Sequence, residues 1–338
     1  MTPVKTEVLP FSPESAEKAA EIMAAGGVVG IPTETVYGLA ADARNESAVR
    51  SIFRAKGRPQ DNPLIVHISA IEQLRPLVRE VPELALRIAE RFWPGPLTMI
   101  FPKSDVIPRA TSGGLDTVAV RMPRSPAARA IIDACGFPLA APSANLSGSP
   151  SPTTAQHVLR DMDGRIPLII DGGECDCGVE STVLCFPAAD RVRILRPGGV
   201  TAEMLSELCA VDIDPAVTSE PPKGAKVLSP GMKYKHYSPK AEVFIVNAHG
   251  KRFRDWCLAH AGGKTLALSA DPVEHGMFRC FGKDGQEQAH RLFALLREAD
   301  DQGAQTVYVE IPSKDGIGLA VYNRLLRAAA FRIVEADE

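Results

Sequence analysis

The chain has 338 residues, 45% of them hydrophobic and 23% charged, and a formal net charge of -3, which is ordinary for a soluble globular protein. This length exceeds what one hydrophobic core usually supports, so two domains are expected. The apolar runs are too short for a membrane span, and the start, MTPVKTEVLPFSPESAEK, lacks the apolar core of a signal peptide, so cytoplasmic residence is expected.

Residues 1–210 are predicted to form one domain. Ser12 can cap a first helix, with Pro13 in its first turn. Hydrophobic periodicity predicts helices at 12–27, 46–57, 83–93, 125–136, 151–162 and 200–210. It predicts strands at 28–33, 64–69, 96–101, 116–123, 137–140, 166–173, 180–186 and 191–198. The two types do not alternate strictly, which favours an α/β domain around a mixed, twisted sheet.

Residues 211–240 are predicted to be a linker that acts as a lid on the active site. Its second part, PPKGAKVLSPGMKYKHYSPK, holds five lysines, four prolines and no acid. Such a segment is either a lid that closes over an anionic ligand or a solvated tether that extends by self-repulsion.

Residues 241–338 show a more regular pattern. Strands are predicted at 241–248, 264–269, 277–282 and 306–312, and helices at 251–262, 285–303 and 317–331. This predicts a small doubly wound domain. The two glycines of GIGLAVYNR are too short a match to a dinucleotide fingerprint, and helix–strand packing is favoured over cofactor binding.

The seven cysteines are scattered, and only Cys175 and Cys177 lie close together, as C-x-C. With no second pair at metal spacing, reduced thiols are favoured over a zinc site.

Polar residues cluster where strands of the first domain end. In KGRPQDNPLIVH, Lys56 and Arg58 form either a solvated helix end or a phosphate clamp. His67 is either an ordinary strand residue or, beside such a clamp, a substrate ligand.

Arg121 sits in the apolar strand VAVRMP and needs an anionic partner if it is buried. The partner is either an internal acid, such as Glu34 or Glu180, or a carboxylate or phosphate of a ligand.

The loop APSANLSGSPSP is either a simple turn-rich connection or a ligand site. Its hydroxyls, carboxamide and backbone N–H groups suit phosphate or ribose oxygens beyond a strand's carboxyl end. The sequence contains neither a G-x-S-x-G elbow nor H-E-x-x-H. Electrostatic positioning of a nucleotide is therefore favoured over covalent catalysis.

At these residues the sequence resembles the threonylcarbamoyl-AMP synthase family in its two-domain form. PTETVYGLA, KGRP with NPL, TVAVRMP, SAN, GVESTV and LRPG match the YrdC-type catalytic domain in order. SPGMKYKHYSP matches the family's connector, and GLAVYNRLLRAA matches its C-terminal domain. The resemblance implies a YrdC-like twisted mixed sheet with helices, followed by a small Rossmann-like doubly wound domain.

The resemblance also implies an activity. Family members are nucleotidyltransferases that condense L-threonine, bicarbonate or CO2, and ATP with Mg²⁺, giving threonylcarbamoyl-adenylate and pyrophosphate. A downstream complex then transfers the threonylcarbamoyl group to an adenosine beside the anticodon of tRNA. No metal-ligating side chain is expected.

Site residues follow from the same resemblance. Lys56 and Arg58 are expected to neutralise charge in the transition state. The expected ATP contacts are Lys56, Arg58, Asn62, Thr117, Ser143, Asn145, Ser151, Arg196 and Tyr234 of the connector. The expected threonine contacts are Thr33 or Thr35, His67, Arg121, the backbone at Ala141, and Ser181.

Two other functions compete with this interpretation. One is an RNA-binding module of the same fold without synthase activity, although five tyrosines and two tryptophans form no interleaved basic and aromatic stripe. The other is carbamoyl transfer in hydrogenase maturation, a setting that brings zinc-finger cysteines and an acylphosphatase module which this sequence lacks.

Overall fold

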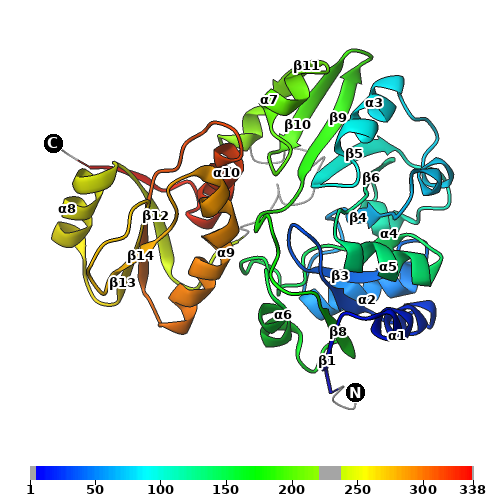
Figure 1. Ribbon diagram of the computed structural model, residues 1–338, viewed down its shortest axis with the longest axis horizontal. Helices are drawn as coiled ribbons and strands as arrows, with labels where there is room; N and C mark the ends of the chain where they lie inside the picture. Colours follow the sequence, from blue (N-terminus) through cyan, green and yellow to red (C-terminus); the bar gives the residue numbers. More distant parts are fainter. Residues whose placement is uncertain (1–4, 221–236, 337–338) are drawn as a thin grey trace.

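The computed structural model describes residues 5–220 and 237–336, which contain two β-sheets (Figure 1). The first sheet has eleven strands in the order β1-β8-β2-β3-β7-β4-β6-β5-β9-β10-β11. The second has five strands in the order β14-β13-β15-β12-β16. The first sheet is built from strands within residues 7–213, and the second from strands within residues 242–335.

The first sheet is mixed, as predicted. Its strands are β1 (Glu7–Pro10), β2 (Val29–Ile31), β3 (Gly38–Asp42), β4 (Ile65–His67), β5 (Leu97–Pro102), β6 (Thr117–Arg121), β7 (Leu139–Ala140), β8 (Leu168–Asp171), β9 (Thr182–Ala188), β10 (Arg191–Arg196) and β11 (Ala210–Ile213). β4 runs parallel to β6 and antiparallel to β7. β5 runs parallel to β9 and antiparallel to β6. Both pairing types thus meet in the centre of the sheet, where the site is found.

Seven α-helices accompany this sheet in the described residues: α1 (Pro13–Ala24), α2 (Glu46–Lys56), α3 (Glu83–Phe92), α4 (Arg109–Ser112), α5 (Pro126–Cys135), α6 (Ala155–Met162) and α7 (Ala202–Ser206). Ser12 caps α1 as predicted, in a reciprocal capping box with Ser15. α6 begins later than predicted, because Thr154 is its N-cap and the residues before it are not helical.

Four strands were not predicted, namely β1, β3, β11 and β16 (Ile333–Glu335). β1, β11 and β16 are short strands at sheet edges, and β3 (GLAAD) consists mostly of small residues, so none carries a long run of β-branched side chains. β11 pairs with β10 and places residues 211–213 in the first sheet, where a linker was predicted.

The second sheet is parallel throughout, which confirms the predicted Rossmann-like winding. Its other strands are β12 (Glu242–Asn247), β13 (Thr265–Ser269), β14 (Phe278–Cys280) and β15 (Thr306–Glu310). Helix α8 (Gly250–His260) covers the face turned away from the first sheet, and α9 (Gly285–Asp301) and α10 (Gly318–Ala328) lie on the side toward it (Figure 1).

Of the two glycines of GIGLAVYNR, Gly318 allows close packing against the start of α9 and the loop before α10, rather than the helix–strand packing that was predicted, whereas a Cβ on Gly316, whose φ is +54°, would meet no atom within 4 Å. A Cβ on Gly318 would lie 2.5 Å from the carbonyl oxygen of Ser313, and one on Gly285 would lie 2.9 Å from the Gly318 nitrogen. Only glycine allows the starts of α9 and α10 to approach this closely.

Glu310 occupies the crevice at the carboxyl ends of β12, β13 and β15. Its carboxylate accepts hydrogen bonds from the backbone N–H of Gly250, at the start of α8, and of Ala270, after β13, at 2.9 and 2.8 Å. In doubly wound sheets, this crevice is where ligands usually bind.

The two halves share a hydrophobic cluster. Val36 and Val179 from the first half pack with Phe293 and other side chains of the second. Gly178 has a φ of +74°, and a Cβ there would lie 2.4 Å from the carbonyl oxygen of Ala289 on α9. The two backbones therefore touch directly beside the site. In residues 5–220 and 237–336, no helix has both the length and the apolar character needed to cross a bilayer.

Candidate active site

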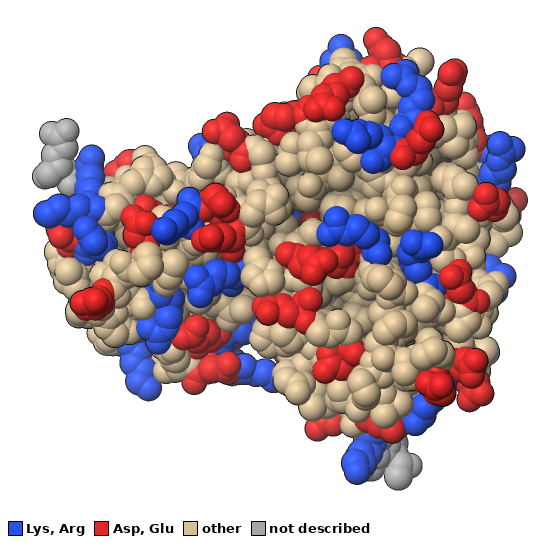
Figure 2. Space-filling view, in the orientation of Figure 1, with Lys and Arg blue, Asp and Glu red and all other residues tan. Residues whose placement is uncertain are grey.

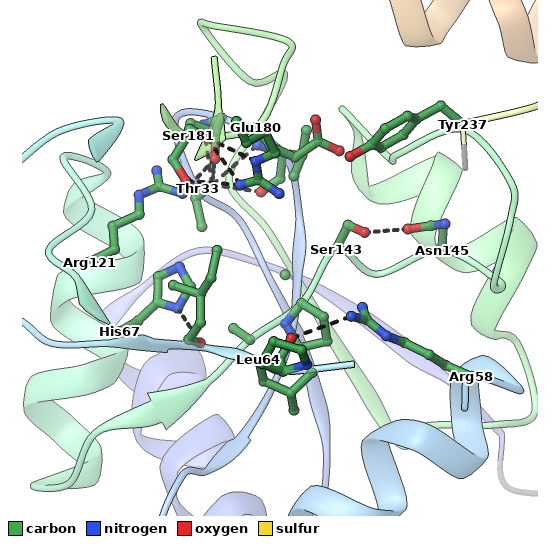
Figure 3. Close-up of a pocket in the computed structure, with 18 residues that line it drawn as sticks. Thr33, Arg58, Leu64, His67, Arg121, Ser143, Asn145, Glu180, Ser181 and Tyr237 are labelled. Atoms are coloured by element: carbon green, nitrogen blue, oxygen red, sulfur yellow. Dashed lines mark hydrogen bonds between the residues drawn. The ribbon is translucent and has the colours of Figure 1, made fainter. Parts of the chain in front are cut away.

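A pocket opens where several strands of the first sheet begin or end (Figure 3). The loop after β2 supplies Thr33 and Thr35, and the last residues of the parallel neighbours β4 and β6 supply His67 and Arg121. The other lining residues are Val36, Gly38, Arg58, Pro63, Leu64, Ile65, Ala141, Pro142, Ser143, Asn145, Glu180, Ser181, Arg196 and Tyr237. The pocket and its surroundings include about 660 Å³ of empty space, part of it open to solvent.

Arg121 pairs with Glu34 at one side of the pocket. Its Nη2 lies 2.7 Å from Glu34 Oε1, and both side chains are almost fully buried. Its Nη1 donates to Thr35 Oγ1 at 2.8 Å, and its Nε donates to the Gly95 carbonyl at 3.3 Å. Burial raises the pKa of Glu34, but the Arg121 charge and hydrogen bonds outweigh this and hold it below its ordinary value. Among the partners for Arg121 that the sequence left open, the internal acid that pairs with it is Glu34.

His67 lies beside Arg121, in register with it across β4 and β6. Its Nδ1 is 3.2 Å from the Ile65 carbonyl oxygen. Burial, with help from the nearby Arg121 charge, lowers the pKa of His67 to about 3. The imidazole is therefore neutral at pH 7 and can exchange hydrogen bonds, but it is a weak base.

Lys56 and Arg58 diverge at the end of α2. Gly57 between them adopts a left-handed conformation, with φ of 62°, and caps the helix. Lys56 Nζ turns inward and donates to the carbonyl oxygens of Ser143 and of Asn145, the latter at 2.6 Å. Arg58 lines the pocket, and its Nη2 is 3.4 Å from the Pro63 carbonyl oxygen. Lys56 therefore fixes the loop that presents Ser143 and Asn145.

Ser143 and Asn145 form one polar edge of the pocket. The Ser143 hydroxyl donates to Asn145 Oδ1 at 2.6 Å, and Asn145 Nδ2 donates to the Ser149 carbonyl at 2.9 Å. Burial, followed by repulsion from Arg58, lowers the pKa of Lys56 well below its ordinary value.

Glu180, Ser181 and Arg196 form another wall of the pocket, hereafter the 180/196 wall. Arg196 donates from Nε and Nη2 to the Ser181 carbonyl at 3.2 and 3.1 Å. The Ser181 hydroxyl also pairs with Thr98 Oγ1 at 2.8 Å. The segment before β9 is thereby attached both to the end of β10 and to β5.

Glu180 is the acid in this wall, and both of its carboxylate oxygens are engaged. Oε1 accepts from the Ser151 hydroxyl at 2.5 Å, and Oε2 accepts from Nε of Arg324, on α10, at 2.7 Å. Burial raises the pKa of Glu180, but Arg324, Arg196 and the Ser151 hydroxyl together bring it below its ordinary value. The carboxylate is therefore ionised at pH 7.

Tyr237, the first residue of the second described range and part of the predicted linker, also lines the pocket. It has a φ of 64°, unusual for a residue with a side chain, and its ring is 5.4 Å from that of Phe293. The Arg324 guanidinium lies 5.5 Å from the Tyr237 ring centroid.

Ten of the predicted site residues line this pocket: Thr33, Thr35, Arg58, His67, Arg121, Ala141, Ser143, Asn145, Ser181 and Arg196. Both threonines of PTETVYG are present, and their hydroxyls are 2.8 Å apart. Segments far apart in the sequence thus converge on one place.

Four other predicted residues do not line the pocket. Lys56 supports the loop described above, Ser151 holds Glu180, and Thr117 lies at the start of β6, at the opposite end from Arg121. Asn62 is 1% exposed, and its amide oxygen and nitrogen have no hydrogen-bond partner among the described residues. Tyr234 and most of the predicted lid lie outside the described residues, so those assignments remain predictions.

Two family models match the chain in succession. The model described as "Telomere recombination" matches residues 21–198, and the model described as "Threonylcarbamoyl-AMP synthase, C-terminal domain" matches residues 200–330. The threonylcarbamoyl-AMP synthase of Pyrococcus abyssi is 46% identical over 324 residues, with 94% of each chain covered.

The chain belongs to the threonylcarbamoyl-AMP synthase family.

Other members of the family agree with this assignment over their full length. The threonylcarbamoyl-AMP synthase of Bacillus subtilis is 42% identical, with 97% of each chain covered. A solved structure of the P. abyssi protein complexed with L-threonine matches with a TM-score of 0.91 at 43% identity, covering 99% of each chain. The fold inferred from the family resemblance is thereby confirmed.

Two polar residues that line the pocket, Glu180 and Tyr237, are not among the predicted site residues. The sequence raised Glu180 only as a partner for Arg121, although an acid at the start of the predicted strand ESTVLCF was a usable sign. Tyr237 was passed over in favour of Tyr234, and the two tyrosines of KYKHYSP look equivalent without the backbone conformation that turns Tyr237 inward.

Proposed function

We propose that the protein condenses L-threonine, bicarbonate or CO2, and ATP to threonylcarbamoyl-adenylate and pyrophosphate, as a nucleotidyltransferase. The observation that carries the proposal is the placement of Arg121 and Arg58 on opposite sides of one pocket (Figure 3). Two separated cations suit two anionic ligands, an amino-acid carboxylate and a polyphosphate.

The threonine would bind on the Arg121 side. Arg121 can face its carboxylate with a planar guanidinium, and the hydroxyls of Thr33, Thr35 and Ser181 are within the same lining. Neutral His67 would hydrogen-bond the ligand without adding charge. The solved P. abyssi structure is a complex with this same amino acid, L-threonine.

ATP would bind on the Arg58 side. Arg58 and Arg196 supply positive charge, and Ser143 and Asn145 supply hydrogen bonds. The buried Asn62 amide, which has no partner among the described residues, would gain one from the nucleotide. Mg²⁺ would enter with the phosphates and neutralise part of their charge, with phosphate and water oxygens as its ligands.

The chemistry needs no protein nucleophile. The ammonium group of threonine loses a proton, and the resulting amine adds to CO2 and releases a second proton to solvent, forming a carbamate. A carbamate oxygen attacks the α-phosphorus of ATP, the bond to the β-phosphate oxygen breaks, and pyrophosphate leaves. The protein's part is to hold the reactants in line and to offset the developing charge with Arg58 and Arg196, while Lys56 keeps the Ser143–Asn145 loop in position.

The test is pyrophosphate release from ATP and Mg²⁺, with threonine and bicarbonate omitted in turn and the adenylate identified by mass spectrometry. We expect release that requires both co-substrates and that collapses in Arg58→Ala. Release without threonine would contradict the proposal. Folded protein that binds RNA in a steeply salt-dependent way and releases no pyrophosphate would favour the RNA-binding alternative.

The product is a mixed anhydride and needs an acceptor. We propose that a separate complex transfers its threonylcarbamoyl group to an adenosine of tRNA.

On the face shown in Figure 2, basic and acidic side chains of the described residues are interspersed, which suits an enzyme acting on small substrates.

A further inference from the structure

We infer that Arg324, on α10 of the second sheet, is a positioning residue for the reaction carried out at the first sheet. It fixes the 180/196 wall, and through that wall it sets the affinity for threonine. The inference rests on the proposed function, because threonine is the ligand whose binding it concerns.

The contacts of Arg324 reach both segments that form the wall. Nε donates to Glu180 Oε2 at 2.7 Å, and Nη2 donates to the carbonyl oxygen of Pro197 at 3.0 Å and lies 3.5 Å from that of Glu180. Pro197 directly follows Arg196, and Glu180 directly precedes Ser181. One guanidinium therefore ties together the two chain segments that carry the wall's polar groups.

The third segment joins through the carboxylate. Glu180 Oε1 accepts from the Ser151 hydroxyl at 2.5 Å, so the segment at 151 is held by the same acid. Nη1 of Arg324 is directed to the neighbouring Asn323 side chain at 2.8 Å. This arrangement needs several donors in a fixed plane, which arginine has and lysine does not.

Burial makes the contacts between Arg324 and Glu180 difficult to replace. Arg324 is 0% exposed and Glu180 is 7% exposed, so water cannot replace a lost partner unless the wall moves. Without Arg324, a buried carboxylate would face a pocket that receives a carboxylate and a polyphosphate. It would repel these ligands, and the wall would move to solvate it.

A second interdomain arginine provides a matched control. Arg297, on α9, pairs with Asp161 at 2.7 Å and donates to the Pro150 carbonyl at 2.6 Å. It is nearly as buried as Arg324 and spans the same two halves, but it does not contact the 180/196 wall. Loss of Arg297 tests what interdomain attachment alone contributes.

The experiment measures pyrophosphate release at varied threonine and saturating ATP and bicarbonate, together with threonine binding by calorimetry. We expect Arg324→Met to raise the threonine KM and dissociation constant roughly 10- to 100-fold, as misplacement of binding groups does. Arg324→Lys should fall between Arg324→Met and the unmodified chain. Arg297→Met should lower thermal stability and leave the threonine KM within about twofold of the unmodified chain.

A merely structural role gives a different pattern. Partial unfolding would lower the apparent kcat in proportion to the folded fraction and leave the threonine KM unchanged, and that result would overturn the inference. Glu180→Gln provides a second route to the same contact. If Arg324 acts through Glu180, the effects of Glu180→Gln and Arg324→Met will be strongly non-additive in the double variant, and additive effects would overturn the inference.

The proposed function and this inference can fail separately. An unmodified chain that shows no threonine-dependent release overturns both. An active unmodified chain whose Arg324 variants keep its threonine KM overturns the inference alone.

Discussion

His67 is held neutral by its surroundings, since burial and the adjacent Arg121 lower its pKa to about 3 from 6.5. A depressed histidine pKa affects folding as well as binding. Between these two values the unfolded chain binds a proton at His67 and the folded chain does not, so folding stability falls as the pH drops from 6.5 toward 3.

Replacing His67 with glutamine should remove this contribution. The loss of stability between pH 6.5 and pH 4 should become smaller than in the unmodified chain, by an amount on the order of 2–3 kcal/mol. Urea unfolding at both pH values measures it. His260→Gln, on the exposed end of α8, is the control, and an unchanged pH slope in His67→Gln would show that His67 is protonated in the folded state.

Arg121 should separate stability from binding. Arg121→Met leaves Glu34 buried without its partner and should cost roughly 3–5 kcal/mol of stability. Adding Glu34→Gln removes the stranded charge, so the double variant should regain much of this stability. Threonine binding should stay lost in both, because neither offers a cation to the carboxylate. Calorimetry and urea unfolding distinguish the two effects, and threonine binding by the double variant would refute the role of Arg121.

Most of the predicted site residues within the described chain line the pocket, but their partners could not be predicted. Arg121 was expected to need an anion, yet the sequence left Glu34, Glu180 and a ligand as equal choices. Glu180 and Arg324 are 144 positions apart, and only the docking of α10 against the first sheet brings them together. Partners of buried charges depend on strand order and domain packing, which no local pattern encodes.

At the scale of elements, the end of α2 gives two adjacent cations different tasks. The left-handed Gly57 turns the chain, so that Lys56 points into the protein and Arg58 lines the pocket. The K-x-R pattern predicted a cationic helix end, but the different directions of the Lys56 and Arg58 side chains depend on the Gly57 cap. Helices with clear caps and strands with β-branched residues were well predicted, whereas short strands at sheet edges were not.

These two roles predict that loss of either cation lowers activity, but that only loss of Lys56 lowers stability. Lys56→Met leaves the carbonyls of Ser143 and Asn145 without their donor and should lower stability by roughly 1–3 kcal/mol, along with activity. Arg58→Ala should lower activity with little change in melting temperature. Differential scanning calorimetry alongside the pyrophosphate assay tests the pair, and equal melting temperatures for the two variants would contradict the supporting role of Lys56.

For the whole molecule, the interface between the two halves lies beside the site. Val36 follows Thr35 in the lining, and Val179 precedes Glu180, and both pack into the cluster shared with the second half. Gly178 contacts the backbone of α9 at the same place. We therefore expect the two halves to unfold as one unit.

The two tryptophans allow this to be measured, since Trp93 lies in the first half and Trp256 in the second. Trp93→Phe and Trp256→Phe each leave one fluorescent reporter. Their urea transitions should coincide, because the shared cluster and two buried ion pairs couple the halves. Arg297→Met in each background should move the two midpoints apart. Separate midpoints in the parent variants would show that the halves unfold independently.

The Glu310 carboxylate at the ends of β12, β13 and β15 affects whether the second half can bind a ligand. Its oxygens already satisfy the backbone groups to which a free phosphate or nucleotide would bind. A side chain of the protein itself therefore occupies the position in the second sheet where a dissociable ligand would otherwise bind. The stability of the second half should therefore not depend on the concentration of ATP. It can hold α10 and Arg324 in the same place while ATP is consumed and replaced at the first sheet.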